Sequence, residues 1–351
     1  MMEFLEQVSL WEHLNETKKP IVLYGMGDGA DKILDELGRR GIAAAGVFAS
    51  DEFCRGQRFR GFEVTTYAQA KERFGDMIVL VAFGTQLPEV MQRIKDIAAV
   101  QETYAPDVPV VGGGEAFDTA YVKKYAQEMQ AAYRMLEDDL SRRTFMDMLH
   151  YKVSGKLDDL FDCESSAGEV YRDILRLSDQ ETYVDAGAYT GDTIAEFMQY
   201  AGGYRQIVAI EPDEKNFRRL EKSTEGLGNR MLCNCAAYDE DTYIRFDTRG
   251  GRNSAVGAQG KTICAQRIDS ILGGQEVTYI KLDVEGQEAA ALRGAKETIQ
   301  KYRPKMLVSA YHRNDDMFRL PLLVREMRDD YKVYLRHFPY IPAWDTNYYF
   351  V

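Results

Sequence analysis

Three short segments of the chain carry residues that could bind a ligand or catalyse a reaction, and the first is a glycine-rich turn. Asp185-Ala186-Gly187-Ala188-Tyr189-Thr190-Gly191-Asp192 follows an apolar run that is typical of a strand. Gly187 and Gly191 lack a Cβ, so the backbone can turn tightly and approach a ligand closely. The helix predicted to begin at Asp192-Thr193 offers free amide groups there. Alone, this segment predicts only a tight turn beyond a strand end.

An acid at the tip of the next predicted strand forms the second segment. Glu211-Pro212 follows an apolar run that ends at Ile210, and a parallel sheet would bring this acid next to the glycine turn. A carboxylate at that place can accept hydrogen bonds from both ribose hydroxyls of an adenosine. The turn and the acid together therefore predict a nucleoside-bearing ligand, with NAD and S-adenosylmethionine as alternatives.

The third segment places two carboxylates where a further predicted strand ends. Asp283 and Glu285 stand two residues apart in the run from Tyr279 to Glu288, with Lys281 just inside the strand. Acids at this position face the place where the amino-acid end of a methyl donor and a methyl acceptor would meet. The third segment therefore favours S-adenosylmethionine over NAD.

In this order and spacing, the segments resemble the FkbM family of S-adenosylmethionine-dependent methyltransferases. The resemblance covers residues 165–351 approximately and is carried by the runs Tyr183 to Thr193, Glu211 to Asp213, Asn234 to Ala236, Arg267 to Leu272, Ile280 to Glu288 and Leu292 to Ala295. It implies a Rossmann-like methyltransferase fold and methyl transfer to a hydroxyl oxygen. The implied acceptor is a saccharide or another small molecule, such as a natural product.

The resemblance also implies which residues contact the cofactor. Asp185, Gly187 and Gly191 would line its methionine end. Glu211 would hold the ribose, and the turn Asn234-Cys235-Ala236 would flank the adenine. The other expected cofactor contacts are Ala188, Tyr189, Asp192, Thr193, Pro212 and Asp283.

Methyl transfer from a sulfonium is an SN2 displacement, so the acceptor oxygen must be aligned and must lose its proton. His312, at the end of the fifth predicted strand, is one candidate base because an imidazole titrates near neutral pH. Asp283 or Glu285 is the rival base, and a reaction without a dedicated base is the third alternative. Lys281 completes the expected catalytic set. Asp283 could instead bind the acceptor or a metal, although we predict no metal site.

The fifth predicted strand departs from the family pattern. Many relatives carry an acid in a Val-Glu-x-His pattern, where this chain reads Val308-Ser309-Ala310-Tyr311-His312. The acid is therefore missing while the histidine is kept. This change leaves a non-catalytic protein that binds S-adenosylmethionine as an alternative function.

An alternation of strands and helices must position these segments. We expect strands over 183–185, 206–210, 231–236, 277–282, 305–310, 332–336 and 348–351. Helices are expected over 193–200, 214–224, 287–302 and 321–329, and residues 243–246 and 262–267 indicate a hairpin-type insertion. The alternation predicts an α/β fold whose mostly parallel sheet has seven strands.

Two further parts precede this domain, which we place at 179–351. Residues 1–114 alternate strands (21–24, 43–49, 77–82) with helices (30–40, 67–74, 88–97) and predict a smaller Rossmann-like domain. Residues 115–178 contain no proline and predict a helical connector. Its apolar stripe should pack against the neighbouring domains and consists of Tyr121, Tyr125, Met129, Tyr133 and Leu136.

The N-terminal domain has a glycine turn of its own. Gly25-Met26-Gly27-Asp28-Gly29-Ala30 follows a predicted strand, and Asp51 follows the second strand at nearly the spacing of a dinucleotide fingerprint. The last glycine, Gly29, comes one residue earlier than in the Gly-x-Gly-x-x-Gly fingerprint. Two interpretations stay open: a nucleotide or nucleotide-sugar site, and a domain used for packing or acceptor docking. An NAD-dependent oxidoreductase is the corresponding alternative function.

Composition limits the partners. The net charge of −12 disfavours nucleic acid and membrane surfaces. The first residues carry acids and no apolar run after a basic start, so we expect no secretory signal, and the longest apolar runs are too short for a membrane helix. We expect the five scattered cysteines to be reduced thiols in the core. We therefore predict a cytoplasmic protein, whose oligomeric state is left open and includes a homodimer. The acceptor depends on loops such as 249–260, interpreted either as a mobile cover or as a plain connection.

Overall fold

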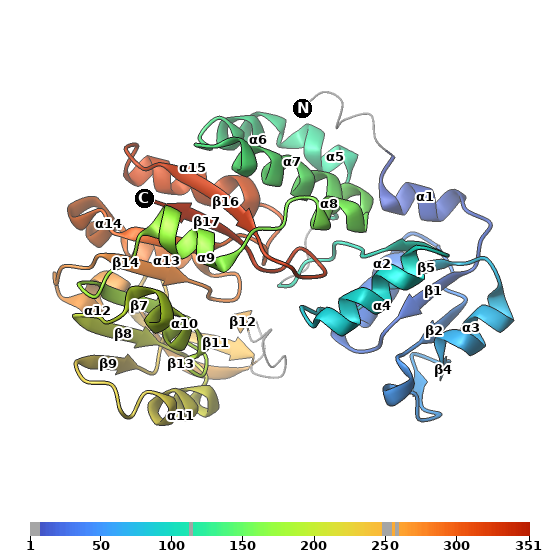
Figure 1. Cartoon of the computed structure of the whole chain (residues 1–351), viewed down its shortest axis with the longest axis horizontal. Coiled ribbons are helices and arrows are strands. Elements are labelled where there is room, and N and C mark those ends of the chain that lie inside the picture. The colour runs from blue at the N-terminus through green and yellow to red at the C-terminus, as the bar shows by residue number, and fades with distance from the viewer. Residues whose placement is uncertain (1–7, 112–114, 248–254, 257–259) are drawn as a thin grey trace.

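The computed structural model of the chain describes residues 8–111, 115–247, 255–256 and 260–351. A smaller sheet domain (blue) lies at one end, a larger one (olive to red) lies at the other, and a group of helices (green) lies above and between them (Figure 1). Apart from residues 255–256 and 260, the loop 249–260 lies outside the described residues.

The larger sheet carries the three segments singled out above. Its seven strands have the order β16-β17-β15-β14-β7-β8-β9; β17 is antiparallel to both of its neighbours, and the other neighbouring strands are parallel. The predicted mostly parallel seven-stranded sheet is therefore confirmed. The strands are β7 (Thr182–Ala186), β8 (Gln206–Ile210), β9 (Arg230–Cys233), β14 (Tyr279–Leu282), β15 (Lys305–Ser309), β16 (Val333–His337) and β17 (Thr346–Phe350).

Helices cover both faces of this sheet, which explains why its central strands are continuous apolar runs. Phe197 and Leu220 pack on one face, in a core with Tyr183 and Tyr279, while Leu292 and Phe318 pack on the other. The helices are α10 (Asp192–Ala201) and α11 (Glu214–Ser223) on the first face, and α12 (Ile268–Leu272), α13 (Glu288–Gly294), α14 (Lys296–Tyr302) and α15 (Asp316–Met327) on the second.

The strand predicted over 231–236 is shorter than expected. It ends at Cys233 because the side chain of Asn234 donates a hydrogen bond to the carbonyl oxygen of Glu211 at 2.8 Å and turns the chain. The next residues join a separate sheet with the order β10-β13-β11-β12, in which β11 and β13 form the predicted antiparallel insertion. Its strands are β10 (Ala236–Ala237), β11 (Thr242–Asp247), β12 (Ala255–Val256) and β13 (Lys261–Gln266).

Two helix predictions were wrong at their boundaries. The helix expected to begin at Pro321 begins at Asp316. Proline has no N–H for the carbonyl four residues earlier, and the hydroxyl of Tyr348 bonds that carbonyl, of Met317, instead. The helix expected over 287–302 is two helices, because the Asp269 carboxylate accepts the first backbone N–H groups of α14 and starts it anew.

The N-terminal sheet is also mostly parallel. Its order is β3-β4-β2-β1-β5-β6, and only β3 is antiparallel to its neighbour. The strands are β1 (Ile21–Tyr24), β2 (Gly46–Phe48), β3 (Arg58–Phe59), β4 (Phe62–Thr65), β5 (Ile78–Val81) and β6 (Glu102–Tyr104). The helices are α1 (Leu10–Glu16), α2 (Asp28–Arg39), η2 (Asp51–Phe53), α3 (Tyr67–Phe74) and α4 (Pro88–Ala98).

Helices between the two sheets join their cores. Tyr125 stacks on Phe318 of α15 at 5.4 Å between ring centroids, and one continuous buried cluster runs from Val22 through Phe145 to Val184. These helices are α5 (Thr119–Lys124), α6 (Ala126–Tyr133), α7 (Asp139–Ser154), α8 (Leu157–Phe161), α9 (Ala167–Glu169) and the π-helical turn η3 (Val170–Leu175). The domain boundaries drawn from the sequence stay predictions.

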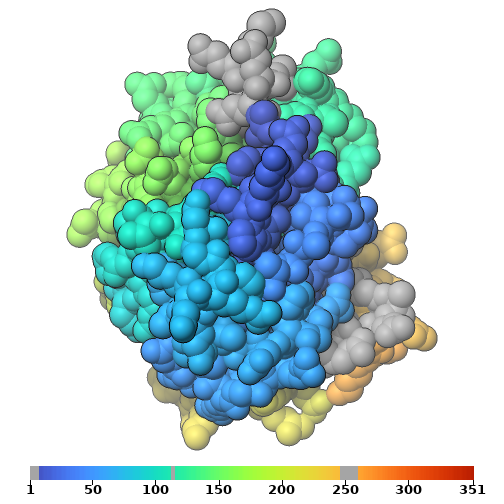
Figure 2. Space-filling view, turned by 90° about the vertical axis from the view of Figure 1, so that its right-hand side faces the viewer, coloured from blue at the N-terminus to red at the C-terminus, as the bar shows by residue number. Residues whose placement is uncertain are grey.

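The two sheet domains also meet directly. Thr85, beyond β5, and Ile341, in the loop between β16 and β17, form an antiparallel bridge of two backbone hydrogen bonds, at 2.8 and 2.9 Å. Figure 1 shows this red loop reaching toward the blue domain, and Figure 2 views the molecule from the side that the blue domain covers. Within the described ranges, no helix combines the length and the apolar character needed to cross a bilayer. All five cysteines are free thiols.

Candidate active site

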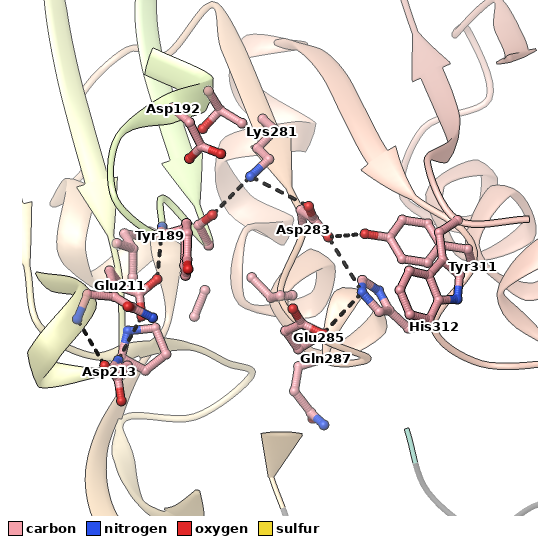
Figure 3. A pocket seen from close by; sticks show the side chains of 18 of the residues that line it. Tyr189, Asp192, Glu211, Asp213, Lys281, Asp283, Glu285, Gln287, Tyr311 and His312 are labelled. Atoms are coloured by element: carbon pink, nitrogen blue, oxygen red, sulfur yellow. Dashed lines mark hydrogen bonds and ion pairs between the residues drawn. The ribbon is translucent and has the colours of Figure 1, made fainter. Parts of the chain in front are cut away.

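A cavity of about 360 Å³ lies beyond the carboxyl ends of β7, β8, β14 and β15. It brings the glycine turn, the acid after β8 and the acids after β14 to one place, as the sequence indicated (Figure 3). The expected residues that line it are Gly187, Tyr189, Asp192, Thr193, Glu211, Pro212, Ala236, Lys281, Asp283, Glu285 and His312.

The glycine turn is packed against the segment that follows β14. A Cβ on Gly187, which has φ of +84°, would lie 1.8 Å from the carbonyl oxygen of Asp283. Only glycine allows both this backbone angle and this approach. Two residues further, Tyr189 has φ of +47°, which a non-glycine residue rarely adopts. The turn is thus fixed tightly at the mouth of the cavity.

Glu211 binds this turn from the side. Its two carboxylate oxygens accept backbone N–H groups of Tyr189 at 2.9 Å and of Asp213 at 2.8 Å. The side chain is almost fully buried, and this burial raises the pKa of Glu211 to about 7. The carboxylate therefore changes its charge close to neutral pH.

Lys281 lies beneath the turn rather than free in the cavity. Its ammonium donates to the carbonyl oxygen of Gly187 at 3.0 Å and forms an ion pair with buried Asp185 at 3.2 Å. Burial alone would lower the pKa of Lys281, but the Asp185 and Asp283 carboxylates outweigh it and raise this pKa. Thr193 donates to the other oxygen of Asp185 at 2.5 Å. These contacts hold the turn in place.

His312 is buried among three carboxylates. Its Nε2 lies 3.4 Å from Glu285 and 3.6 Å from Asp283, and its Nδ1 lies 3.0 Å from Glu288. Figure 3 shows the ring facing both Asp283 and Glu285. Tyr311 donates a hydrogen bond to Asp283 at 3.1 Å on the same side. The imidazole therefore connects the two acids that face the cavity.

The charges of this cluster follow from its geometry. Burial alone would lower the pKa of His312, but the Glu288, Glu285 and Asp283 carboxylates hold it well above its ordinary value. Burial would raise the pKa of Asp283, yet Lys281 and His312 lower it. Burial raises the pKa of Glu285 despite His312. Asp283 is thus the weaker base of the two, Glu285 is the stronger, and His312 is an imidazolium at neutral pH.

The same cluster has the spacing of a metal site. One ligand atom each of Asp283, Glu288 and His312 lies within 4.8 Å of the others. The sequence-based expectation that there is no metal stays a prediction.

The remaining expected residues support the site from behind. Asp185, Ala188 and Cys235 are buried. Gly191 packs against Ser223 of α11, and Asn234 holds the Glu211 backbone as described above. We therefore expect these five residues to position the cavity wall rather than to touch a ligand.

Several lining residues were not predicted from the sequence. They come from a loop after β5, a segment before α5, and the loop between β16 and β17: Gln86, Val110, Tyr340, Trp344 and Asp345. Tyr311, next to His312, also lines the cavity. Asp345, like Glu285, is a non-glycine residue with positive φ, and burial raises its pKa to about 6. Strained residues gather at functional sites, but sequence alone does not reveal strain.

The N-terminal glycine turn has different surroundings. A Cβ on Gly25 would lie 2.5 Å from the ring of Phe83, and this ring packs edge-on against Tyr24. Tyr24 in turn stacks on Phe48 at 4.6 Å. Asp51 is exposed on the short helix η2. Aromatic side chains of the domain itself thus fill the space against the start of this turn.

The mostly parallel sheet, with helices on both faces and a cavity at its carboxyl ends, is a Rossmann-like fold. The model of the methyltransferase FkbM domain matches residues 185–341, so the C-terminal part of this chain is an FkbM methyltransferase domain. No curated protein matches the chain in sequence.

One solved structure has a similar fold over nearly the whole chain. The crystal structure of the methyltransferase FkbM from Methylobacillus flagellatus KT is similar with a TM-score of 0.73 and 22% identity, covering 95% of this chain and 90% of that one. At this identity the similarity shows the fold alone, and it extends over the N-terminal domain.

Two more distant structures match about half of the chain. An rRNA methylase from Streptococcus thermophilus has a TM-score of 0.34 and 14% identity, over 52% of this chain and 92% of its own. Fibrillarin from Aeropyrum pernix, solved with bound S-adenosyl-L-methionine, has a TM-score of 0.35 and 12% identity, over 53% of this chain and 73% of its own. Nothing further rests on these two similarities.

Proposed function

We propose that this methyltransferase moves the methyl group of S-adenosylmethionine to a hydroxyl oxygen of a saccharide or another small-molecule acceptor. The observation that carries the proposal is one cavity in which the glycine turn and Glu211 face Asp283 and Glu285. A nucleoside fits the first pair and a reacting hydroxyl fits the second.

The chain offers a cradle for the donor. Glu211 would accept the ribose hydroxyls, and the turn that Gly187 permits would let the backbone approach the methionine end. The wall at Pro212 and Ala236 would flank the adenine. Lys281 and Asp185 would hold this turn, so we assign them positioning roles. The bound sulfonium supplies an electrophilic methyl group.

The carboxylates beyond β14 would handle the acceptor. Glu285 is the stronger base and would take the hydroxyl proton as the new C–O bond forms and the C–S pair returns to sulfur. Ionised Asp283 would stabilise positive charge at the methyl group before transfer. His312, charged and bonded to both acids, would position them. Its environment favours this role over that of the base.

A methyl-transfer assay with labelled S-adenosylmethionine and a panel of hydroxylated acceptors tests the proposal. Transfer of label to an acceptor hydroxyl is the expected result, unchanged by a chelator. If none of the hydroxylated acceptors receives the label, hydroxyl methylation is contradicted. If the chelator abolishes turnover, a metal-free reaction is contradicted.

The base is tested by Glu285→Gln. A general base contributes about 10²–10⁴-fold, so we expect turnover to fall by at least about 100-fold with unchanged affinity for S-adenosylhomocysteine. Glu225→Gln, at an exposed position on the same domain, is the matched control. Unchanged turnover in Glu285→Gln would remove Glu285 from the mechanism.

The role of His312 is tested by the pH profile of His312→Gln. The imidazolium lowers the pKa of Glu285, so its loss should raise that pKa and move the acid limb of turnover to higher pH. If His312 itself were the base, the variant would lose that limb altogether.

A further inference from the structure

We propose that the N-terminal domain forms one wall of the acceptor site, and that Trp344, Tyr340 and Gln86 bind the non-reacting part of an uncharged, hydroxylated ring such as a saccharide. This inference rests on the proposed function, because it concerns the acceptor of the same reaction. It gives the N-terminal domain a role in substrate selection.

The bridge between Thr85 and Ile341 fixes the geometry of this wall. Its two backbone hydrogen bonds hold the loop after β5 against the loop between β16 and β17. Gln86 directly follows Thr85, and Tyr340 directly precedes Ile341, so both side chains are carried to the same end of the cavity that they line. Two segments far apart in sequence are therefore joined beside the reacting acids.

The indole of Trp344 is held in place by the N-terminal domain. A Cβ on Gly84 would lie 2.4 Å from this ring, so the indole packs directly on the Gly84 backbone. Tyr340 lies beside it, with ring centroids 5.5 Å apart and planes at 36°. Both rings are partly exposed and line the cavity. Such an aromatic surface presents a flat apolar face, which suits the C–H face of a sugar ring.

The charges around this surface select against anionic acceptors. Glu196, Asp283, Glu285 and Asp345 line the cavity, together with the acids near the donor. Of the described residues that line it, only Lys281 and His312 are basic, and both are paired with carboxylates. A phosphate or nucleoside diphosphate on the acceptor would be repelled here, whereas sugar hydroxyls can donate hydrogen bonds to the acids and to Gln86.

Tryptophan fluorescence reports on this surface without any turnover. The chain has two tryptophans, Trp11 and Trp344, and Trp11 is buried in the N-terminal core. Trp11→Phe therefore leaves Trp344 as the sole emitter. This protein, saturated with S-adenosylhomocysteine, is titrated with maltotriose, xylotriose, chitotriose and UDP-glucose.

The proposal expects a change in Trp344 emission with at least one neutral trisaccharide and none with UDP-glucose. Gln86→Ala should weaken that binding about fivefold, the loss expected for one hydrogen bond, and Gln92→Ala, exposed on α4 and outside the cavity, should leave it unchanged. A response to UDP-glucose, no response to any trisaccharide, or equal effects of the two glutamine variants would overturn it.

Calorimetry on the same samples separates this inference from the proposed function. If S-adenosylhomocysteine does not bind, the proposed function fails. If it binds while Trp344 does not respond, only the acceptor wall fails.

Discussion

The two sheet domains present a glycine turn at the same place, after the first strand of each sheet, and the two turns have opposite surroundings. After β1, the ring of Phe83 packs against Gly25, and Tyr24 and Phe48 stack behind it. After β7, the neighbour of Gly187 is the backbone of Asp283, and the space beyond is a cavity lined by acids. A glycine turn after the first strand thus occurs both with a filled and with an open strand end.

This difference shows that a glycine turn indicates a backbone geometry and does not by itself indicate a ligand site. Glycine is required wherever a backbone must turn tightly or approach another one, and both turns meet that condition. A ligand site needs, in addition, room and a polar partner at the next strand end. Glu211 provides that partner in the C-terminal domain, while Asp51 in the N-terminal domain lies exposed on η2.

The largest expected difference between the two turns is the loss of activity when a glycine of each turn is replaced by alanine. Gly187→Ala would push a methyl group into the Asp283 carbonyl and displace the site, and a displacement near 1 Å costs about 100-fold in rate. We expect methyl transfer to fall by at least this factor. Gly27→Ala also sits at positive φ, yet its Cβ would meet nothing within 4 Å. It should lose about 1–3 kcal/mol of stability and keep its activity. If both variants fold and lose activity equally, the assignment of the active site to the C-terminal turn alone is contradicted.

The acids at the second strand ends give the next largest effect. Glu211→Gln should weaken S-adenosylhomocysteine binding by about 10–100-fold, since hydrogen bonds to a charged group contribute about 1.5–3 kcal/mol. Asp51→Asn should leave this affinity unchanged, as measured by calorimetry. A stronger effect of the Asp51 change would reverse the assignment of the two turns.

The charge of Glu211 makes donor binding depend on pH. With its pKa near 7, the carboxylate that accepts the ribose hydroxyls is mostly ionised at pH 8 and mostly protonated at pH 6. Because the ionised form binds, the Kd for S-adenosylhomocysteine should rise about tenfold from pH 8 to pH 6. The same titration of Glu211→Gln should be nearly flat. A pH dependence that survives this substitution would place the titrating group elsewhere.

The smallest effect concerns the support of the C-terminal turn. Ser223 of α11 donates a hydrogen bond to the carbonyl oxygen of Thr190 at 2.6 Å. Ser223→Ala should raise the Kd for S-adenosylhomocysteine about two- to fivefold, because one hydrogen bond contributes about 0.5–1 kcal/mol. Ser270→Ala removes a similar bond, to Asp241, outside the cavity. It should have no effect on this Kd, and equal changes would contradict a specific role for Ser223.

The parts of the site that could be predicted from the sequence are those set by local pattern. The strands that end at Ala186, Ile210 and Leu282 are short, mostly apolar runs, and parallel pairing brings such strand ends together. Tyr311 and Trp344 could not be found this way. The position of Trp344 depends on the bridge between Thr85 and Ile341, a contact across most of the chain.

The electrostatic state of His312 could not be predicted either. Its strand-end position indicated a base, but its charge depends on Glu288, whose distance from His312 only the fold determines. Some helix boundaries could not be predicted for the same reason. Helix α15 continues through Pro321 because Tyr348 of β17 bonds the carbonyl that proline leaves without a partner.

Calorimetric titration tests whether the donor binds at the C-terminal turn and not at the N-terminal one. The protein is titrated with S-adenosylmethionine, S-adenosylhomocysteine and NAD, with Glu211→Gln and Asp51→Asn alongside. We expect one site for the first two ligands, with an affinity that only the Glu211 change weakens, and no binding of NAD. Binding of NAD, lost in Asp51→Asn, without binding of S-adenosylmethionine would contradict it.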